Sequence, residues 1–306
     1  MKILVTGGAG FIASNVVDAY LAAGHQVVVV DNLASGNRAN LNPAATFYEV
    51  DIRSPQLLEV MEKEQPEVVN HHAAQIDVRR SVADPRFDAS VNIDGSIALL
   101  EACRKTGVRK VIYISSGGAM YGEPEYLPCD ENHPVKPLSP YGATKHTIEH
   151  YVYMYRENFG IDYTVLRYPN VYGPRQDPFG EAGVIAIFTE RMLKGEPVTI
   201  NGSGEQERDF IYVGDCVSAN LMVLEAGGGR EYNLGWGIGT TVNQIYRSLK
   251  GITGYPLDAS YGPAKTGETF RIYLDTSRIR KELNWAPQVP LDEGLARTVQ
   301  FFRERA

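Results

Sequence analysis

A tyrosine and a lysine lie four residues apart in the segment YGATK, residues 141–145. Residues at this spacing share one face of an α-helix, so we expect Tyr141 and Lys145 to point the same way. A phenol is a poor base at neutral pH, but a neighbouring ammonium favours its ionised form. Lowering its pKa to about 7 takes roughly 4 kcal/mol of differential interaction. The pair predicts a tyrosine base, although an amphipathic helix with an incidental Tyr and Lys has the same spacing.

Two hydroxyl groups precede this pair in the segment SSGGAMYG, residues 115–122. Ser115 and Ser116 end the apolar run KVIYISS, which is typical of a buried strand. A hydroxyl there can hydrogen-bond a substrate oxygen, or it can serve ordinary hydrogen bonding at a strand end. The small residues that follow, 117–119, have no side chain that could donate a proton.

A glycine-rich turn near the N-terminus, VTGGAGFIAS, stands between an apolar run and a helical pattern. Gly7 and Gly10 would let the pyrophosphate of a dinucleotide approach the backbone at the positive end of the helix. Asp31 closes the next apolar run, where its carboxylate can accept hydrogen bonds from the adenosine ribose and repel a 2′-phosphate. The pattern indicates NAD rather than NADP, the alternative being a tight turn with a helix-capping Asp.

The elements that position these residues alternate between short apolar runs and helical patterns. The expected strands are KILVT, QVVVVD, a segment near Phe47, EVVNHHA, KVIYISS and DYTVLRY. The expected helices are Phe11 to about Ala23, Leu57 to Glu64, a helix through Leu99 and Leu100, and Pro140 to Phe159. Continuous Val/Ile runs separated by helices predict a doubly wound α/β fold with a parallel sheet. We assign residues 1–168 to a Rossmann-type domain, with a return segment near 210–235, and 169–306 to a smaller lobe.

Composition excludes several other classes of protein. The formal net charge of -7 argues against a nucleic-acid surface, and no apolar run approaches the roughly 20 residues of a membrane span. The chain enters an apolar strand at once, which leaves no room for a signal peptide. Three distant cysteines, Cys103, Cys129 and Cys216, fit a reducing compartment and form neither a zinc spacing nor a disulfide framework. The histidines are scattered, so we predict no metal site. The free cysteines, with no signal peptide and no membrane span expected, predict a cytoplasmic protein.

Taken in order, the motifs resemble those of the extended short-chain dehydrogenase/reductases, and most closely the UDP-glucose (UDP-galactose) 4-epimerases. The resemblance covers nearly the whole chain. Its segments are TGGAGFIAS, VVDNL, DIR, HHAAQ, NIDGS, ISSGGAMYG, SPYGATK, LRYPNVYGPRQ and RDFIYVGD. It implies NAD-dependent epimerisation of a UDP-hexose through a transient 4-keto sugar, with NAD regenerated in each turnover.

The resemblance also implies roles for individual residues. Tyr141 would take the 4-hydroxyl proton, Lys145 would hold the nicotinamide ribose, and a hydroxyl near residue 117 would hold the sugar oxygen. That position is Gly117 here, so Ser116 is the first candidate and Ser115 the second. The implied NAD contacts are Gly7, Gly10, Phe11, Ile12, Asp31, Asn32, Asp51, Ile52, Ala73, Ala74, Asn92, Ser115, Tyr141, Lys145 and Tyr168. The implied substrate contacts are Gln75, Ser116, Tyr141, Asn170, Arg208, Lys265, Glu268 and Arg271.

Alternatives within the family differ in chemistry. Dehydratases and decarboxylases of the family place an acid just after the catalytic hydroxyl, and the small residues here favour epimerisation instead. Ile272 stands where strict UDP-glucose enzymes have Tyr, which would admit N-acetylated sugars. A UDP-glucuronate 4-epimerase, another nucleotide-sugar oxidoreductase or decarboxylase, and a non-catalytic NAD-binding regulator stay open. Apolar stripes on the helices around 92–104 and 140–159 predict a homodimer, as in relatives.

Overall fold

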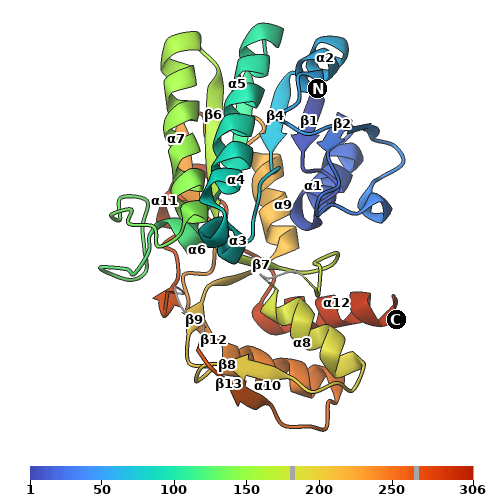
Figure 1. Ribbon diagram of the computed structural model, residues 1–306, viewed down its shortest axis with the longest axis vertical. Coiled ribbons are helices and arrows are strands. Elements are labelled where there is room, and N and C mark those ends of the chain that lie inside the picture. The colour runs from blue at the N-terminus through green and yellow to red at the C-terminus, as the bar shows by residue number, and fades with distance from the viewer. Residues whose placement is uncertain (180–182, 265–268, 306) are drawn as a thin grey trace.

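A seven-stranded parallel sheet forms the centre of the computed structural model, which describes residues 1–179, 183–264 and 269–305. The strand order is β11-β6-β5-β4-β1-β2-β3 (Figure 1). The strands are β1 (Lys2–Thr6), β2 (Gln26–Asp31), β3 (Thr46–Glu49), β4 (Val68–His71), β5 (Lys110–Ser116), β6 (Asp162–Tyr168) and β11 (Arg230–Asn233). The order reverses between β1 and β4, which is where ligands bind in open α/β sheets.

Branched side chains explain why these segments form the inner strands. Val27 to Val30 of β2 are all buried, and β1 is buried along four of its five residues. Such residues favour the pleated backbone, and burial on both faces requires continuous apolar runs rather than alternating ones. The predicted doubly wound α/β fold is therefore confirmed.

Helices cover both faces of the sheet (Figure 1). On one face, α1 (Phe11–Ala22) and α9 (Val213–Met222) share an apolar core with the sheet. On the other face, a second core includes residues of α2 (Gln56–Glu64), α5 (Gly95–Thr106) and α7 (Pro140–Phe159). The two cores hold the carboxyl ends of the strands, and the loops that follow them, in fixed positions.

The helix α7, which carries Tyr141 and Lys145, has local signals at both ends. The Ser139 hydroxyl accepts a hydrogen bond from the Gly142 amide at 3.2 Å, and Pro140 occupies the first turn. Gly160 ends the helix in the left-handed region, with φ of 72°. An N-cap serine, an N-terminal proline and a C-terminal glycine are the preferred residues at these places, so the predicted bounds agree with the observed ones.

A π-helical segment interrupts the long helical stretch before α5. It follows α3 (Val78–Ala83) and α4 (Pro85–Ala89), spans Ser90–Asp94, and leads into α5. Such segments change the direction in which side chains leave a helix and are frequent at functional sites. The residue that this one buries is Asn92.

The smaller lobe lies beyond the carboxyl edge of the sheet (Figure 1). A third apolar core joins its helices α8 (Val184–Leu193), α10 (Val242–Thr253) and α12 (Leu291–Arg303). Its strands are β8 (Thr199–Asn201), β9 (Glu207–Arg208), β12 (Thr240–Thr241), β13 (Ser260–Gly262) and β14 (Arg271–Ile272). The remaining elements are the 3-10 turn Arg38–Asn40, α6 (Gly117–Met120), β7 (Asn170–Tyr172), β10 (Phe210–Tyr212) and α11 (Ser277–Leu283).

The elements β11 and α9 follow residue 168 in the chain but belong to the sheet layers rather than to the lobe. β11 pairs with β6, and α9 packs against α1. They lie within or next to the return segment expected near 210–235. The division of the chain at residue 168 stays a prediction, because the chain crosses between the two parts more than once.

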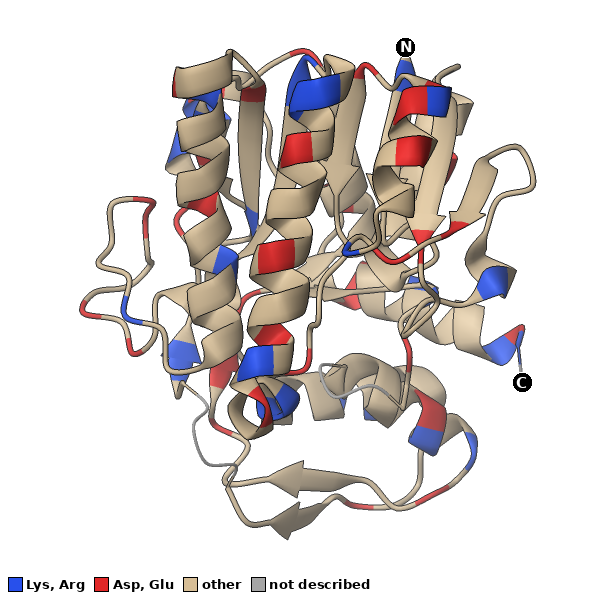
Figure 2. Cartoon of the chain, turned by 45° about the horizontal axis from the view of Figure 1, so that its top comes forward, with Lys and Arg blue, Asp and Glu red and all other residues tan. Residues whose placement is uncertain are grey.

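Surface charges, helix composition and metal-ligating side chains are distributed as follows. In the view of Figure 2, Lys and Arg alternate with Asp and Glu along the helices and form no basic stripe. Within the described part of the chain, no helix combines the length and apolar character that crossing a membrane demands. The same residues contain no group of three or more His, Cys, Asp or Glu placed to hold a metal ion.

Candidate active site

Tyr141 and Lys145 lie near the start of α7, beside the carboxyl end of β5. The Lys145 side chain is buried, and its Nζ lies 4.5 Å from the centre of the Tyr113 ring. The Tyr113 hydroxyl in turn donates to the Lys145 carbonyl at 3.1 Å, which fixes α7 against β5. A buried ammonium on an aromatic face lies in a largely water-free setting, where its charge acts strongly on its neighbours.

The Ser116 hydroxyl, the first candidate from the sequence, lies beside the Tyr141 phenol and lowers its pKa. Ser115 is buried, and its hydroxyl has no hydrogen-bond partner among the described residues, but it helps to lower the pKa of Glu149 on α7. Neighbouring residues of a strand point to opposite faces, which explains why the two hydroxyls act on different groups. Gly117 follows directly, and a Cβ there would lie 2.5 Å from Cδ1 of Leu274. A larger residue in place of Gly117 would push away the segment that packs behind Ser116.

In the protein alone, the pKa of Tyr141 is raised and that of Lys145 is lowered. Both shifts oppose the ionised phenol and charged ammonium that the sequence predicts for the complex with NAD. Burial raises the pKa of Tyr141 to about 12, the Ser116 hydrogen bond lowers it, and the charge of Asp88 raises it. Burial lowers the pKa of Lys145 to about 7, while Glu149 and Asp88 raise it. A phenolate at neutral pH therefore requires a protonated Lys145 together with the positive nicotinamide ring that the resemblance implies.

The glycine turn after β1 has a shape that fits a pyrophosphate. Gly7 has φ of +69°, and a Cβ there would lie 2.8 Å from the backbone nitrogen of Ala73. Gly10 is the N-cap of α1, and no described side chain caps this helix end. The amides of the first turn, including those of Phe11 and Ile12, are therefore available to an anion. Small residues and unpaired amides together form a dinucleotide cradle.

Asp31 closes β2 beside this turn. Its carboxylate accepts hydrogen bonds from the amides of Ala9 at 3.0 Å and Leu33 at 2.7 Å. Burial raises its pKa, and these two amides lower it. Each oxygen keeps a lone pair, so the carboxylate can also accept hydrogen bonds from ribose hydroxyls. The placement agrees with the predicted preference for NAD.

The next predicted contacts, Asn32 and Asp51, bond to each other. Asn32 donates to Asp51 at 2.9 Å, and Arg53 donates to both oxygens of the same carboxylate. The hydrogen bonds from Arg53 hold the pKa of Asp51 well below its usual range. Ile52, which stands between Asp51 and Arg53 in the sequence, is buried in the core. The Asp51 carboxylate is therefore ionised and fixed in place at the edge of the cradle.

The segment after β4, which includes Ala73 and Ala74, contains a buried imidazole, that of His72. Nε2 of His72 is buried and has no hydrogen-bond partner among the described residues. Burial and the charge of Lys145 lower the pKa of His72 to about 3, so the ring is neutral. An orphaned buried nitrogen is costly, and its position near Lys145 suits a ligand rather than solvent.

The side chains of two other predicted contacts, Gln75 and Asn92, form hydrogen bonds within the protein. The Gln75 amide donates to Asp88 at 2.9 Å, and Asn92 donates to Asp88 at 3.1 Å and to Thr144 at 3.2 Å. Asn92 also accepts from the Gln75 backbone amide at 2.8 Å, and Thr144 donates to Asp88 at 2.8 Å. Both residues hold the loop after β4 against α7, and their amides have little capacity left for a ligand. Sequence reasoning missed Asp88 and Thr144, although Thr144 adjoins Lys145.

Tyr168, the last predicted NAD contact, points its hydroxyl into the core. The hydroxyl accepts a hydrogen bond from Asn220 of α9, which also accepts from Asn70 of β4 at 2.7 Å. Burial raises the pKa of Tyr168 well above its usual range. Its hydroxyl therefore supports the packing of α9 on the sheet and is not directed at a cofactor.

Three of the predicted substrate contacts lie near Ser116 or on two neighbouring strands of the lobe: Asn170, Arg208 and Arg271. A Cβ on Gly118 would lie 3.7 Å from Oδ1 of Asn170, which places this amide near the catalytic hydroxyl. Arg208 of β9 donates to the Phe270 carbonyl at 3.2 Å. Arg271 of β14 lies beside β9, is half exposed, and pairs with Glu207 at 3.3 Å. Lys265 and Glu268 lie outside the described residues.

Ile272 does not face an open pocket. It is buried with Met120, Tyr121 and Leu274 in a small apolar cluster. The predicted admission of N-acetylated sugars through a smaller residue at this position therefore lacks a direct structural basis. A cavity of about 270 Å³ does lie in the lobe, lined by Ile187, Phe188, Arg191, Thr199 and Asn201.

Comparisons with known proteins agree with this geometry. The model of the NAD dependent epimerase/dehydratase family matches residues 3–235. A UDP-glucose 4-epimerase of Mycolicibacterium smegmatis is 46% identical over 312 residues, covering 100% of both chains. The crystal structure of the Thermotoga maritima UDP-glucose 4-epimerase with UDP-glucose is 50% identical, with a TM-score of 0.98 over 100% of this chain and 99% of that one. The Thermus thermophilus UDP-glucose 4-epimerase complex with NAD is 42% identical, with a TM-score of 0.95 over 100% of both chains.

Proposed function

Since the chain belongs to the NAD dependent epimerase/dehydratase family, we propose that it catalyses the reversible 4-epimerisation of a UDP-hexose. The substrate class is that of its relatives, which are UDP-glucose 4-epimerases at 42–50% identity over the full length. The reaction interconverts UDP-glucose and UDP-galactose through a transient 4-keto sugar. Bound NAD would supply the hydride-transfer chemistry at C4 of the sugar.

Each residue of the site has one task in this reaction. Tyr141 takes the proton of the 4-hydroxyl and later returns it, and Ser116 donates a hydrogen bond to the same oxygen. Lys145 holds the nicotinamide ribose, and its charge favours the phenolate. Between the two transfers the keto sugar turns about its bond to the phosphate, so that its other face receives the hydrogen.

The cofactor and substrate are held by different parts of the molecule. Gly7, the first turn of α1 and Asp31 would bind the pyrophosphate and the adenosine ribose of NAD. Arg208 and Arg271 supply cations for the substrate diphosphate from neighbouring strands of the lobe. This division leaves the sugar at the carboxyl edge of β5, where Ser116 and Tyr141 meet.

One arrangement carries the proposal: the Ser116 hydroxyl lies beside the Tyr141 phenol and lowers its pKa, in a site whose following residues contribute no acid. An elimination or decarboxylation would need a proton donor beside the leaving group. Gly117, Gly118 and Ala119 offer none, whereas removal and return of hydrogen at one carbon needs only the phenol. The arrangement thus supports epimerisation over dehydration.

A substrate panel tests the proposal. The purified protein is incubated with UDP-glucose, UDP-galactose, their N-acetyl forms and UDP-glucuronate, and the products are separated. Interconversion of glucose and galactose forms without net NADH supports the proposal. Turnover of UDP-glucuronate alone, release of carbon dioxide or steady accumulation of NADH would replace it by one of the alternatives. NAD binding without any turnover would indicate a non-catalytic regulator.

The quaternary structure is part of the proposal. Tyr153, Met154 and Phe159 of α7 are exposed apolar side chains on the outer face of the sheet's helical layer. We place the partner of a homodimer on this face, where α5 and α7 of two copies would form a four-helix bundle. The three free cysteines are all buried, which fits the cytoplasm as the site of action.

A further inference from the structure

Glu149 lies one turn beyond Lys145 on α7, on the helix face that also carries Tyr141. Its side chain is only 7% exposed. A buried carboxylate is costly unless it is paired, so its presence four residues from a buried lysine calls for a physical explanation.

The contacts of Glu149 show that its carboxylate is charged. Arg167 of β6 binds both oxygens, with Nη2–Oε2 at 2.6 Å and Nε–Oε1 at 3.1 Å, and Nδ1 of His146 lies 3.4 Å from Oε2. Burial alone would raise the pKa of Glu149, but His146, Arg167 and Ser115 together lower it to about 2. The carboxylate therefore stays ionised throughout the neutral range.

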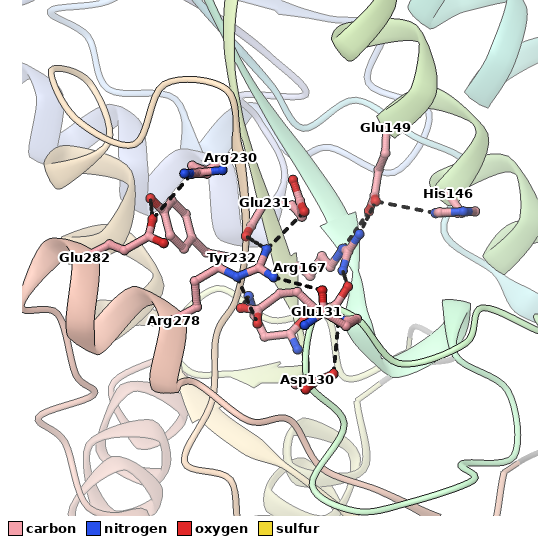
Figure 3. A network of polar contacts seen from close by, with 12 residues as sticks. Asp130, Glu131, His146, Glu149, Arg167, Arg230, Glu231, Tyr232, Arg278 and Glu282 are labelled. Carbon is pink, nitrogen blue, oxygen red and sulfur yellow. Dashed lines mark hydrogen bonds and ion pairs between the residues drawn. The ribbon is translucent and has the colours of Figure 1, made fainter.

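A second layer of contacts fixes Arg167 itself (Figure 3). Its Nη1 donates to the Tyr121 hydroxyl at 3.0 Å and to the Glu131 carbonyl at 3.4 Å. The Glu131 carboxylate lies 3.5 Å from Nε of Arg278, on α11. The position of the Glu149 charge is thus set by β6, by the loop after α6 and by α11, and not by α7 alone.

Lys145 meets charged and titratable groups from every element around it. The carboxylates of Glu149 on α7 and Asp88 on α4 raise its pKa, against the larger effect of burial. The imidazoles of His71 and His72, at the end of β4, are held neutral by burial and by the charge of Lys145. Tyr113 of β5 and Tyr141 of α7 are the remaining neighbours, and burial raises the pKa of both phenols.

We propose that Glu149 is a positioning residue for the epimerisation, and that its anchored carboxylate keeps Lys145 an ammonium inside a site from which water is excluded. The inference rests on the proposed function. Glu149 touches no reacting atom and acts through Lys145, whose charge then acts on Tyr141 and on the nicotinamide ribose. The pair Glu149–Arg167 is therefore more than a packing contact between α7 and β6.

The direct test is a titration of Lys145 in the protein alone. The Cε signal of ¹³C-labelled lysine, assigned by its loss in Lys145→Met, reports the charge of this side chain. In Glu149→Gln we expect its midpoint to fall by about one pH unit, because a counter-charge is lost. Glu157→Gln removes a carboxylate from an exposed position of the same helix and should leave the midpoint unchanged.

The pH profile of turnover gives a second readout. With the Lys145 midpoint near 7 in the wild type and near 6 in Glu149→Gln, the ratio of their rates should rise from about two at pH 6 to about ten at pH 8. A purely structural role would lower the rate by the same factor at every pH.

A double variant separates the counter-charge from the ion pair. Glu149→Gln leaves the Arg167 guanidinium as a buried charge without its carboxylate partner. Adding Arg167→Gln removes this unpaired charge and its destabilising effect. If the proposal holds, the double variant still titrates Lys145 below the wild-type midpoint; a return to the wild-type midpoint overturns it. A wild-type protein that titrates as expected but converts no nucleotide sugar refutes the proposed function and, with it, the role of Glu149 in epimerisation; the action of Glu149 on the charge of Lys145 would still be shown by the titration.

Discussion

The phenol of Tyr141 is the residue on which the reaction depends. Buried beside Ser116, it has a pKa of about 12 in the protein alone, so nearly all of it is protonated at neutral pH. Binding of a positive nicotinamide ring must therefore supply much of the ionisation, which ties base strength to the presence of the oxidised cofactor. A phenol whose ionisation is favoured by bound NAD would be the stronger base where hydride transfer is also possible.

Replacing this phenol should stop the chemistry and spare the cofactor site. We expect Tyr141→Phe to lower kcat by about 10³-fold or more, since general acid–base catalysis contributes about 10²–10⁴-fold. Bound NAD, measured by absorbance after release from the protein, should stay at the wild-type amount. A Tyr141→Phe protein with near wild-type turnover would show that another group is the base.

The two adjacent serines should differ sharply. Ser116→Ala removes a hydrogen bond to the phenol and to the sugar oxygen, and we expect kcat to fall about 10- to 100-fold, as for other hydrogen bonds to charged groups. Ser115→Ala, the matched control, should lower kcat no more than a few-fold, because its hydroxyl acts on the pKa of Glu149 and not on that of Tyr141. The reverse order in steady-state kinetics would make Ser115 the catalytic hydroxyl.

Gly7 sets the closest approach between the glycine turn and the segment after β4. In Gly7→Ala the new Cβ would meet the Ala73 nitrogen at 2.8 Å, in a backbone region that costs about 1–2 kcal/mol for an L-residue. We expect a lower Tm and much weaker NAD binding by calorimetry. Gly107→Ala is the control, because its φ is similar and nothing lies within 4 Å of the new methyl group. Equal loss of NAD affinity in both variants would show that the glycine turn at Gly7 does not bind the dinucleotide.

At the scale of elements, α7 is a support whose first turn carries the base. Ser139 caps the helix two residues before Tyr141, so the cap governs both stability and the placement of the phenol. On the opposite side, Asp88 and Thr144 hold the same turn against α4 and the π-helical segment. A substitution that weakens the first turn of α7 should therefore lower kcat as well as the stability of the fold.

Two capping variants separate these effects. Ser139→Ala and Thr241→Ala each remove an N-cap hydroxyl, from α7 and α10, and each should lower the stability by about 0.5–2 kcal/mol. We expect only Ser139→Ala to lower kcat several-fold at a temperature where both proteins are folded. Denaturant titrations and kinetics on the same samples check this. Equal kcat values would show that the cap does not position Tyr141.

The sequence predicted the elements more completely than the contacts between them. The bounds of α7 and the Val-rich inner strands follow from local residue choice, so they were predictable. The bonding of Gln75 and Asn92 to Asp88 depends on the π-helical segment and on Thr144, which no local pattern specifies. Tyr168 lies at the end of a strand, as predicted, but its hydroxyl meets Asn220 on a helix far along the chain. Such pairings arise from tertiary packing, which residue spacing does not encode.

At the scale of the whole molecule, the outer layer of helices has an unpartnered apolar face. Tyr153→Asp would place a charge at the centre of the proposed dimer contact, and we expect a monomer by light scattering. Leu257→Asp, an exposed apolar position of the lobe, should leave the mass unchanged. A wild-type protein that already scatters as a monomer would refute the dimer without affecting the proposed reaction.

The packing of Leu274 against Gly117 has a consequence for the order in which the protein matures. Translation delivers the nucleotide half first: the glycine turn, Asp31, Tyr141 and Lys145 all leave the ribosome before Leu274. Leu274, which packs behind Ser116, is synthesised more than a hundred residues after Lys145. A nascent chain could thus gain the means to hold its redox partner well before it gains the means to use it.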